Sequence, residues 1–204
     1  MDALVEAARS AGVRDERVLA AISAVLRSGF VPAEFAGRAD FDVPIPIPNA
    51  QVTTQPSLVA RMVEALALEG DERVLEVGTG YGWQTALLAQ LAREVFSVER
   101  FADLAETARA VLVGLENVVI VVGDRSEGLP EHAPFDAILV AAAYPSVPPP
   151  LAEQLAQSGR LVQPLGPAGA EDVVLFEKRG GALRRVRSLG GAHFVRLHGR
   201  HGFP

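Results

Sequence analysis

The ten residues Val74-Leu-Glu-Val-Gly-Thr-Gly-Tyr-Gly-Trp83 decide the fold of this chain. A short apolar run predicts a buried strand, and it ends in a glycine-rich turn that opens a helix, where open α/β sheets bind nucleotide-like ligands. Glycine permits positive φ and lets a ligand approach the backbone closely. A dinucleotide fingerprint needs its third glycine at position 83, where Trp83 stands, and no Gly-Lys-Ser/Thr follows to make a phosphate loop. The turn therefore predicts a ligand other than a dinucleotide or a nucleoside triphosphate.

Strands and helices alternate on both sides of this turn. Strands are predicted over Arg73–Val77, Val95–Val98, Val118–Val122, Phe135–Ala142 and Arg160–Pro164, and helices over Ser57–Leu68, Gly82–Arg93, Phe101–Val113 and Pro149–Ala156. Near-continuous apolar strands between helices indicate a mostly parallel sheet that is covered on both faces. The end of the chain differs, because Val173–Lys178 and Leu183–Ser188 are joined through Gly180–Gly181 as in an antiparallel hairpin.

The sequence pattern of the N-terminal quarter differs from that of the rest of the chain. Apolar residues at helical spacing predict an amphipathic helix from Asp15 to Ser28, and Gly29 closes it. Phe30 to Pro56 then carries five prolines, which remove backbone donors and interrupt helices and strands. We expect a long irregular segment that is packed and functional. The predicted fold is α/β, with a doubly wound, mostly parallel sheet, a C-terminal antiparallel hairpin and an N-terminal helical cap.

Composition excludes several classes of protein. The 204 residues are 49% hydrophobic and 22% charged, which is ordinary for a globular protein and leaves ample apolar surface for a core. The chain has no cysteine, so disulfides, thiolate zinc sites and cysteine nucleophiles are excluded. Neither a signal peptide nor an apolar run of membrane-spanning length is visible. With a net charge of −6, we expect a cytoplasmic monomer that binds neither membrane nor nucleic acid.

Two clusters of residues are weaker indications of function. His193, His198 and His201 crowd together near the end, but adjacent glycines argue against a helix that presents them to a metal, so we expect no metal site. From position 178 onward there are seven basic residues and no acidic one. Such a run is more often the solvated face of an edge hairpin than a nucleic-acid footprint, although it could also attract acidic peptides.

The spacing Glu76-x-Gly78-x-Gly80-x-Gly82 resembles motif I of the S-adenosylmethionine-dependent methyltransferases, whose fold is Rossmann-like. Two more carboxylates stand where that family would place them. Glu99 ends the second strand and could accept hydrogen bonds from the ribose hydroxyls, and Asp124 follows the third strand and could accept from the adenine amino group. Acidic residues suit a sulfonium ligand, which carries positive charge and no phosphate. The alternative is a structural turn flanked by helix-capping carboxylates.

Other stretches resemble the protein-L-isoaspartate O-methyltransferases, from about residue 15 to the end. They are Phe30-Val-Pro, Asp40-Phe-Asp-Val-Pro-Ile-Pro-Ile, Gln51-Val-Thr-Thr-Gln-Pro, the segment beginning Glu127-Gly-Leu-Pro, Ala141-Ala-Ala-Tyr-Pro, and the tail from Phe194 to Phe203. The resemblance implies an enzyme that methylates the α-carboxylate of isoaspartyl residues in damaged proteins or peptides. It also implies a single domain over 1–204, in which 1–56 form the N-terminal helix and substrate-side loop and 57–204 the cofactor-binding core.

The resemblance assigns residues to the site one by one. Thr54 would be the active-site hydroxyl, and the cofactor would be bound by Gln51, Val52, Thr53, Glu76, Gly78, Thr79, Gly80, Gly82, Glu99, Asp124 and Arg125. Two positions depart from the family pattern, because Thr54 stands where Ser is common and Arg125 where Gly is common. These two departures leave two alternatives to the repair enzyme open. The chain could be a relative that methylates aspartates of one dedicated peptide, or a protein that binds S-adenosylmethionine without turnover. A dehydrogenase is the weakest alternative, since it rests on fold analogy alone.

Overall fold

The computed structural model describes residues 2–167 and 169–204, and its centre is a seven-stranded sheet. The strands lie in the order β5-β4-β3-β6-β7-β8-β9, and their bounds are β3 Arg73–Val77, β4 Glu94–Glu99, β5 Val118–Val122, β6 Phe135–Val140, β7 Leu155–Leu165, β8 Glu171–Arg179 and β9 Ala182–Ala192. Strands β3 to β7 pair in parallel, whereas β8 and β9 are antiparallel. The predicted α/β fold and its C-terminal hairpin are confirmed.

The strand order creates a switch point beside β3. The chain runs outward from β3 to β4 and β5, then returns to place β6 on the other side of β3. At such a point the loops that follow two neighbouring parallel strands diverge and leave a crevice at their carboxyl ends. The glycine turn follows β3 directly, so the topology places it in this crevice.

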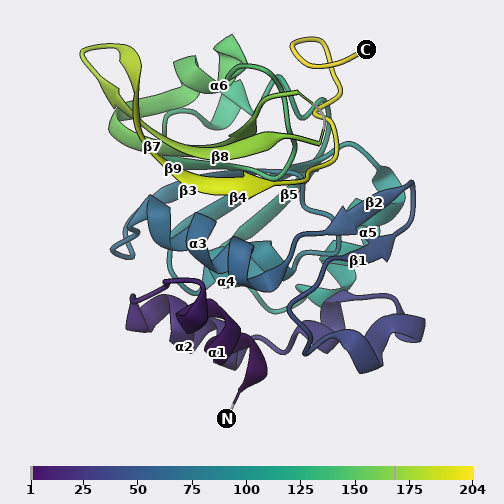
Figure 1. Ribbon diagram of the computed structural model, residues 1–204. Helices are drawn as coiled ribbons and strands as arrows, with labels where there is room; N and C mark the ends of the chain where they lie inside the picture. The colour runs from purple at the N-terminus through teal and green to yellow at the C-terminus, as the bar shows by residue number, and fades with distance from the viewer. Residues whose placement is uncertain (1, 168) are drawn as a thin grey trace.

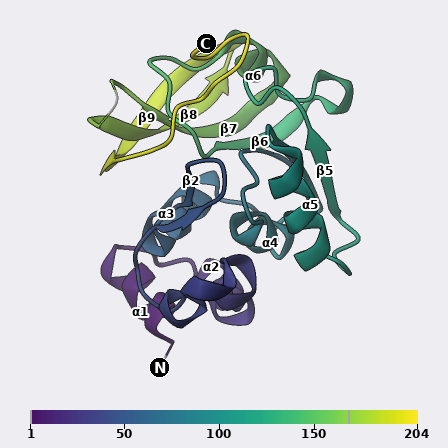
Figure 2. The same ribbon diagram turned by 90° about the vertical axis from the view of Figure 1, so that its right-hand side faces the viewer.

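Helices cover both faces of the sheet, as Figures 1 and 2 show. Three of them form one layer, namely α3 Pro56–Leu66, α4 Trp83–Ala89 and α5 Ala102–Val111, and α6 Pro149–Gln154 lies on the opposite face. Two separate buried clusters follow from this arrangement, because alternate residues of β3 point to opposite sides: Val74 belongs to the cluster with α3 and α4, and Leu75 to the cluster with α6. Both faces of the strand are buried, which explains its unbroken apolar sequence.

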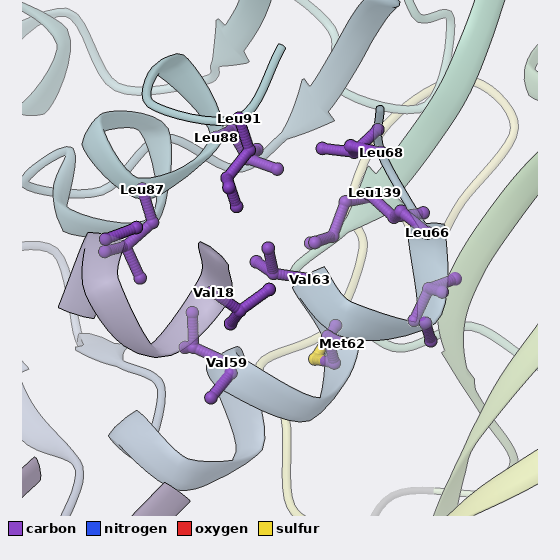
Figure 3. Close-up of a cluster of buried hydrophobic side chains, with 14 of the residues drawn as sticks. Val18, Val59, Met62, Val63, Leu66, Leu68, Leu87, Leu88, Leu91 and Leu139 are labelled. Atoms are coloured by element: carbon purple, nitrogen blue, oxygen red, sulfur yellow. The ribbon is translucent and has the colours of Figure 1, made fainter. Parts of the chain in front are cut away.

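Two further helices lie beneath α3 and α4, as a third layer at the bottom of Figure 1. They are α1 Ala3–Ser10, which the sequence analysis did not predict, and α2 Glu16–Ala24. Val18 of α2 packs with Val59 and Val63 of α3 and with Leu87 of α4 in the cluster of Figure 3. The helical cap is thereby continuous with the main core.

The predicted irregular segment from Phe30 to Pro56 contains regular structure, so that expectation was wrong in part. Helix α2 ends at Ala24 rather than near Ser28, and short 3-10 helices follow at Arg27–Phe30 and Ala33–Arg38. A two-stranded antiparallel hairpin then forms from β1 (Ile45–Ile47) and β2 (Gln51–Thr53). Pro46 is tolerated because it lies exposed in a short edge strand, where a missing donor costs little.

No helix in the described ranges, 2–167 and 169–204, is long and apolar enough to span a membrane. The basic C-terminal region consists largely of paired side chains. Lys178 donates to the backbone carbonyl oxygens of Ala152 and Leu155 at the end of α6, at 2.8 and 2.6 Å. Ion pairs join Arg185 to Asp172 and Arg200 to Glu127. These contacts favour the interpretation of the run as a solvated edge hairpin.

Candidate active site

The glycine turn requires its glycines at alternate positions. Gly78, Gly80 and Gly82 all have positive φ, at 101°, 54° and 91°, a region that residues with a Cβ rarely adopt. Gly82 begins α4, and a Cβ there would lie 2.9 Å from Leu112 Cδ1, so α5 also demands a glycine. Trp83 is buried, and its indole Nε1 donates to the carbonyl oxygen of Val25 at 3.1 Å. The indole therefore packs the helix start against the N-terminal segment.

Glu99, at the end of β4, faces the turn from the neighbouring strand. Its Oε2 accepts a hydrogen bond from the Gly80 amide at 3.0 Å, and its Oε1 accepts from the amides of Arg100 and Phe101. The side chain is 1% exposed and lines the cavity above the glycine turn. A carboxylate has about four acceptor positions, so Oε2 retains one for a hydroxyl donor such as a ribose.

Asp124, after β5, is engaged by the C-terminal tail. Its Oδ1 accepts from the amide and hydroxyl of Ser126, at 2.8 and 2.7 Å, and its Oδ2 accepts from the Arg200 amide at 2.7 Å. Partial burial opposes ionisation, but the hydrogen bonds from Arg200 and Ser126 outweigh it and hold the pKa of Asp124 below its ordinary value. Asp124 lines a cavity with His198 and Phe203 of the tail rather than the glycine-turn cavity.

Glu76 lies beneath the turn, fully buried inside β3. Its carboxyl group accepts from Gln84 Nε2 at 2.9 Å and from the hydroxyls of Thr85 and Ser97, and the Ser97 hydroxyl also contacts that of Thr79. Burial raises the pKa of Glu76 to about 7, although those three hydrogen bonds oppose the shift. The observed contacts of Glu76 fix the turn from below, and it is absent from the described cavity lining.

Arg125 is a buried cation in the glycine-turn cavity. It is 3% exposed, and its Nε has no hydrogen-bond partner among the described residues. Its Nη1 lies 3.7 Å from the position that a Cβ on Gly78 would take. Burial lowers the pKa of Arg125, against the attraction of Glu99. An unpaired buried donor is costly, and a ligand acceptor in this cavity would satisfy it.

The hairpin β1–β2 roofs the same cavity. Ile47 Cδ1 lies 3.4 Å from the Cβ position of Gly80, and Asn49 Nδ2 donates to both carboxylate oxygens of Asp103 at the start of α5. Gln51, Val52, Thr53 and Thr54 line the cavity together with Gly78, Thr79, Gly80, Gly82, Glu99 and Arg125. The structure thus brings together ten of the twelve residues that the sequence analysis assigned to the site, and leaves Glu76 and Asp124 outside this lining.

Thr54 stands at the junction of two cavities. A second cavity, of about 350 Å³, lies between the start of α3 and the end of β9. Four described residues line both spaces, namely Val52, Thr54, Ala141 and Val195, and Thr54 is the only one with a polar side chain. A reaction between ligands of the two cavities would take place beside its hydroxyl.

Sequence reasoning missed the residues that hold this arrangement. Arg27, 1% exposed, donates to the carbonyl oxygens of Ala39, Phe41 and Val43 and to the Thr53 hydroxyl, at 2.8 to 3.3 Å. Asp42 accepts from the Ser57 amide and hydroxyl and from Gln55, which fixes the start of α3. The available signal was an arginine and an aspartate inside apolar, proline-rich sequence, where a charge has to be paired.

The residues of the glycine-turn cavity fit S-adenosylmethionine. Glycines open the backbone, Glu99 retains an acceptor position for a ribose hydroxyl, and Arg125 offers unpaired donors. Among residues 2–167 and 169–204, no group of three or more His, Asp or Glu side chains could hold a metal ion.

Comparison with known proteins places the chain in a family. The family model described as protein-L-isoaspartate(D-aspartate) O-methyltransferase matches residues 1–202. A protein-L-isoaspartate O-methyltransferase of Anaeromyxobacter dehalogenans is 51% identical over 190 residues, which are 91% of each chain. Another, of Methanoculleus marisnigri, is 47% identical over 197 residues, or 96% of this chain and 89% of the relative.

Solved structures agree as well. A protein-L-isoaspartate O-methyltransferase structure superposes with a TM-score of 0.85 at 27% identity, over 98% of this chain and 66% of that one. A structure described as a putative Plasmodium falciparum homologue in complex with S-adenosyl-L-homocysteine gives a TM-score of 0.81 at 23% identity, covers 97% of both chains and shows the fold alone. The chain belongs to the protein-L-isoaspartate(D-aspartate) O-methyltransferase family.

Proposed function

We propose that this chain transfers a methyl group from S-adenosylmethionine to the α-carboxylate of isoaspartyl residues in damaged proteins or peptides. The observation that carries the proposal is the junction at Thr54, where the glycine-turn cavity meets a second cavity. Family membership supports the choice of methyl donor and acceptor.

The proposed methyl transfer requires little acid–base catalysis by the protein. S-adenosylmethionine supplies a methyl group on a positively charged sulfur, and the acceptor is a carboxylate. A carboxylate with a pKa near 4 is ionised at neutral pH, so no general base is needed. The residues at the junction therefore act by positioning and by excluding water. Val52, Ala141 and Val195 supply apolar walls, and the Thr54 hydroxyl orients the acceptor oxygen by donating to the carboxylate.

The roles of the other residues follow from their contacts and are part of the proposal. Glu99 would accept from the ribose, Gly78, Thr79 and Gly80 would present the backbone, and Arg125 would donate to the ligand. Asp124 would reach the adenine end through the acceptor position that Arg200 leaves on Oδ2. Glu76 would act from below, through Ser97 and Thr79.

We also infer that residues 1–204 work as one domain, with 1–56 as the substrate-side cap and 57–204 as the cofactor core. The packing of α2 on α3 and α4 in one cluster supports a single unit. The monomeric state, the cytoplasmic location and the absence of membrane and nucleic-acid partners stay predictions.

The deciding experiment is methyl transfer from radiolabelled S-adenosylmethionine to paired peptides that differ only in isoaspartate or aspartate at one position. Label on the isoaspartyl peptide alone is expected. Label on neither peptide, while S-adenosylmethionine still binds, would contradict the repair function and turn attention to a dedicated peptide. Label on the aspartyl peptide as well would contradict the specificity that we propose.

A further inference from the structure

The second cavity carries a charge pattern that the reaction itself does not need. The polar side chains of its lining in the described chain are Thr54, Gln55, Ser57, Arg61 and His193, and this lining contains no Asp or Glu. Arg61 is the one permanently charged side chain in it. The cavity is therefore locally positive, although the whole chain has a net charge of −6.

The Arg61 guanidinium lies at the wall of the cavity without a partner among the described residues. Arg61 is half-buried, and it forms no hydrogen bond or ion pair with any residue in the described ranges. Its Nη1 and Nη2 lie 3.7 and 3.8 Å from the position that a Cβ on Gly190 would occupy, so the guanidinium lies next to β9 at this residue. A cation that is packed but unpaired at the wall of a cavity is poised for an anionic ligand.

Two carboxylates, those of Asp42 and Glu171, lie near this cavity without lining it. Asp42 is used at the start of α3 by Ser57 and Gln55, with distances of 2.7 to 2.8 Å. Glu171 is buried and its Oε1 accepts from the Gly169 amide, whereas its Oε2 has no hydrogen-bond partner among the described residues and lies 3.9 Å from His193 Nδ1. Neither residue lines the cavity, and neither forms an ion pair with Arg61.

The position of Arg61 determines which residues of a bound substrate peptide it can contact. Thr54 precedes α3, whereas Arg61 lies five residues beyond Pro56, or roughly 7.5 Å along the helix at 1.5 Å per residue. An extended peptide advances about 3.3 Å per residue. Along the helix axis, Arg61 is therefore offset from the start of α3, beside Thr54, by a length equal to about two to three residues of an extended peptide.

We propose that Arg61 makes the acceptor site select peptides with an acidic side chain two or three residues from the methylated residue. The inference rests on the proposed function and adds a sequence preference to it. Arg61 acts on substrate selection and leaves the junction at Thr54 unchanged.

The experiment compares isoaspartyl peptides with Glu, Gln or Lys at each position from −3 to +3, in wild type, Arg61→Gln and Arg61→Glu. In the wild type we expect kcat/KM to be about fivefold to tenfold higher for Glu than for Gln at one of these positions, which corresponds to a partly shielded ion pair. Arg61→Gln should remove that ratio, and Arg61→Glu should reverse it in favour of Lys. The Arg184→Glu variant, which changes an exposed arginine of β9, controls for net charge and should keep the wild-type ratio.

Equal ratios in wild type and Arg61→Glu would overturn the proposal, and so would a wild type that treats Glu and Gln alike at all six positions. A wild type that methylates no isoaspartyl peptide would instead contradict the proposed function. Binding of S-adenosylmethionine to each variant is measured in parallel, and a variant that keeps this affinity has kept its fold.

Discussion

At the scale of single residues, the proposed function assigns the acceptor carboxylate to one hydroxyl, that of Thr54. Thr54 forms no hydrogen bond within the described chain and faces both cavities, so its side chain is free to contact a substrate. Thr54→Val keeps the shape and removes the hydroxyl. We expect kcat to fall about tenfold to a hundredfold, since a hydrogen bond to a charged group contributes about 1.5–3 kcal/mol. Thr54→Ser should retain most of the rate, and affinity for S-adenosylmethionine by calorimetry should be unchanged in both variants.

Thr107→Val is the matched control for this prediction, because it removes a hydroxyl from half-buried Thr107 of α5, which lines neither cavity, with the same change of shape. A Thr54→Val variant with wild-type kcat would remove Thr54 from the reaction.

Glu99 supports a second residue-scale prediction, about cofactor affinity. Glu99→Gln keeps the size of the side chain but removes its charge and half of its acceptor capacity. We expect S-adenosylmethionine to bind more weakly by roughly 1–3 kcal/mol, the cost of leaving a buried hydroxyl poorly paired. Calorimetric titration measures the effect, and Glu94→Gln on the same strand, half-exposed, is the control. Equal affinities for wild type and Glu99→Gln would exclude Glu99 from the site.

Glu76 makes the unfolding free energy depend on pH, and its raised pKa determines the direction of this dependence. Its pKa in the folded protein is about 7, above the ordinary value of 4.5. The folded state therefore binds the proton more tightly, and the stability contributed by the neutral group is lost as pH rises from about 4.5 through 7. The shift corresponds to about 3 kcal/mol. Glu76→Gln imitates the neutral form, so it should gain stability relative to wild type between pH 5 and pH 8.

Urea unfolding at pH 5 and pH 8 measures this difference. The same free-energy difference between variant and wild type at both pH values would show that Glu76 does not titrate in this range.

At the scale of elements, the core of the fold could be predicted from the sequence, and the hairpin β1–β2 that covers the site could not. Strand β3 and the glycine turn are local: the apolar run and the spaced glycines lie within ten residues, and they predicted the fold class and the floor of the cavity. The hairpin β1–β2 is not local. Its sequence is interrupted by Pro44, Pro46 and Pro48, and it is held by Arg27, which lies far before it. No pattern within the segment reports such a contact.

The hairpin should consequently depend on Arg27. Burial lowers the pKa of this arginine to about 10, so it stays charged at neutral pH. Arg27→Met keeps much of the apolar stem but leaves three carbonyl oxygens and the Thr53 hydroxyl without their donor. We expect a loss of about 3 kcal/mol or more in unfolding free energy, because unpaired buried acceptors are costly. Hydrogen exchange should accelerate most at the Ile45 amide, which donates to Thr53 Oγ1.

The exposed Arg38→Met variant is the control for the loss of charge. Uniform acceleration of exchange across the sheet would indicate global destabilisation and contradict the local role of Arg27.

At the scale of the whole molecule, the site is assembled from the two ends of the chain around a central sheet. The N-terminal part supplies Arg27 and the hairpin β1–β2, and the middle supplies the glycine turn and Glu99. The C-terminal tail lies against Asp124 (Figure 1). Family resemblance could assign Asp124 to the cofactor from a local motif, but its bond to Arg200 joins residues 76 positions apart. Contacts at such separation depend on the topology of the sheet.

The contact of the tail with Asp124 and Ser126 requires a glycine at position 199. A Cβ on Gly199 would coincide with Asp124 Oδ1 and with Ser126 Oγ, and its φ of +148° is unfavourable for other residues. Gly199→Ala should therefore detach residues 199–204 from Asp124, and the pKa of Asp124 should rise because the Arg200 amide no longer donates to it. Carboxypeptidase should shorten the tail faster in the variant, and NMR titration should show the change at Asp124. Gly70→Ala, also at positive φ but with nothing within 4 Å, separates backbone strain from the clash. A Gly199→Ala tail as resistant as that of Gly70→Ala would show that Asp124 does not hold the C-terminus.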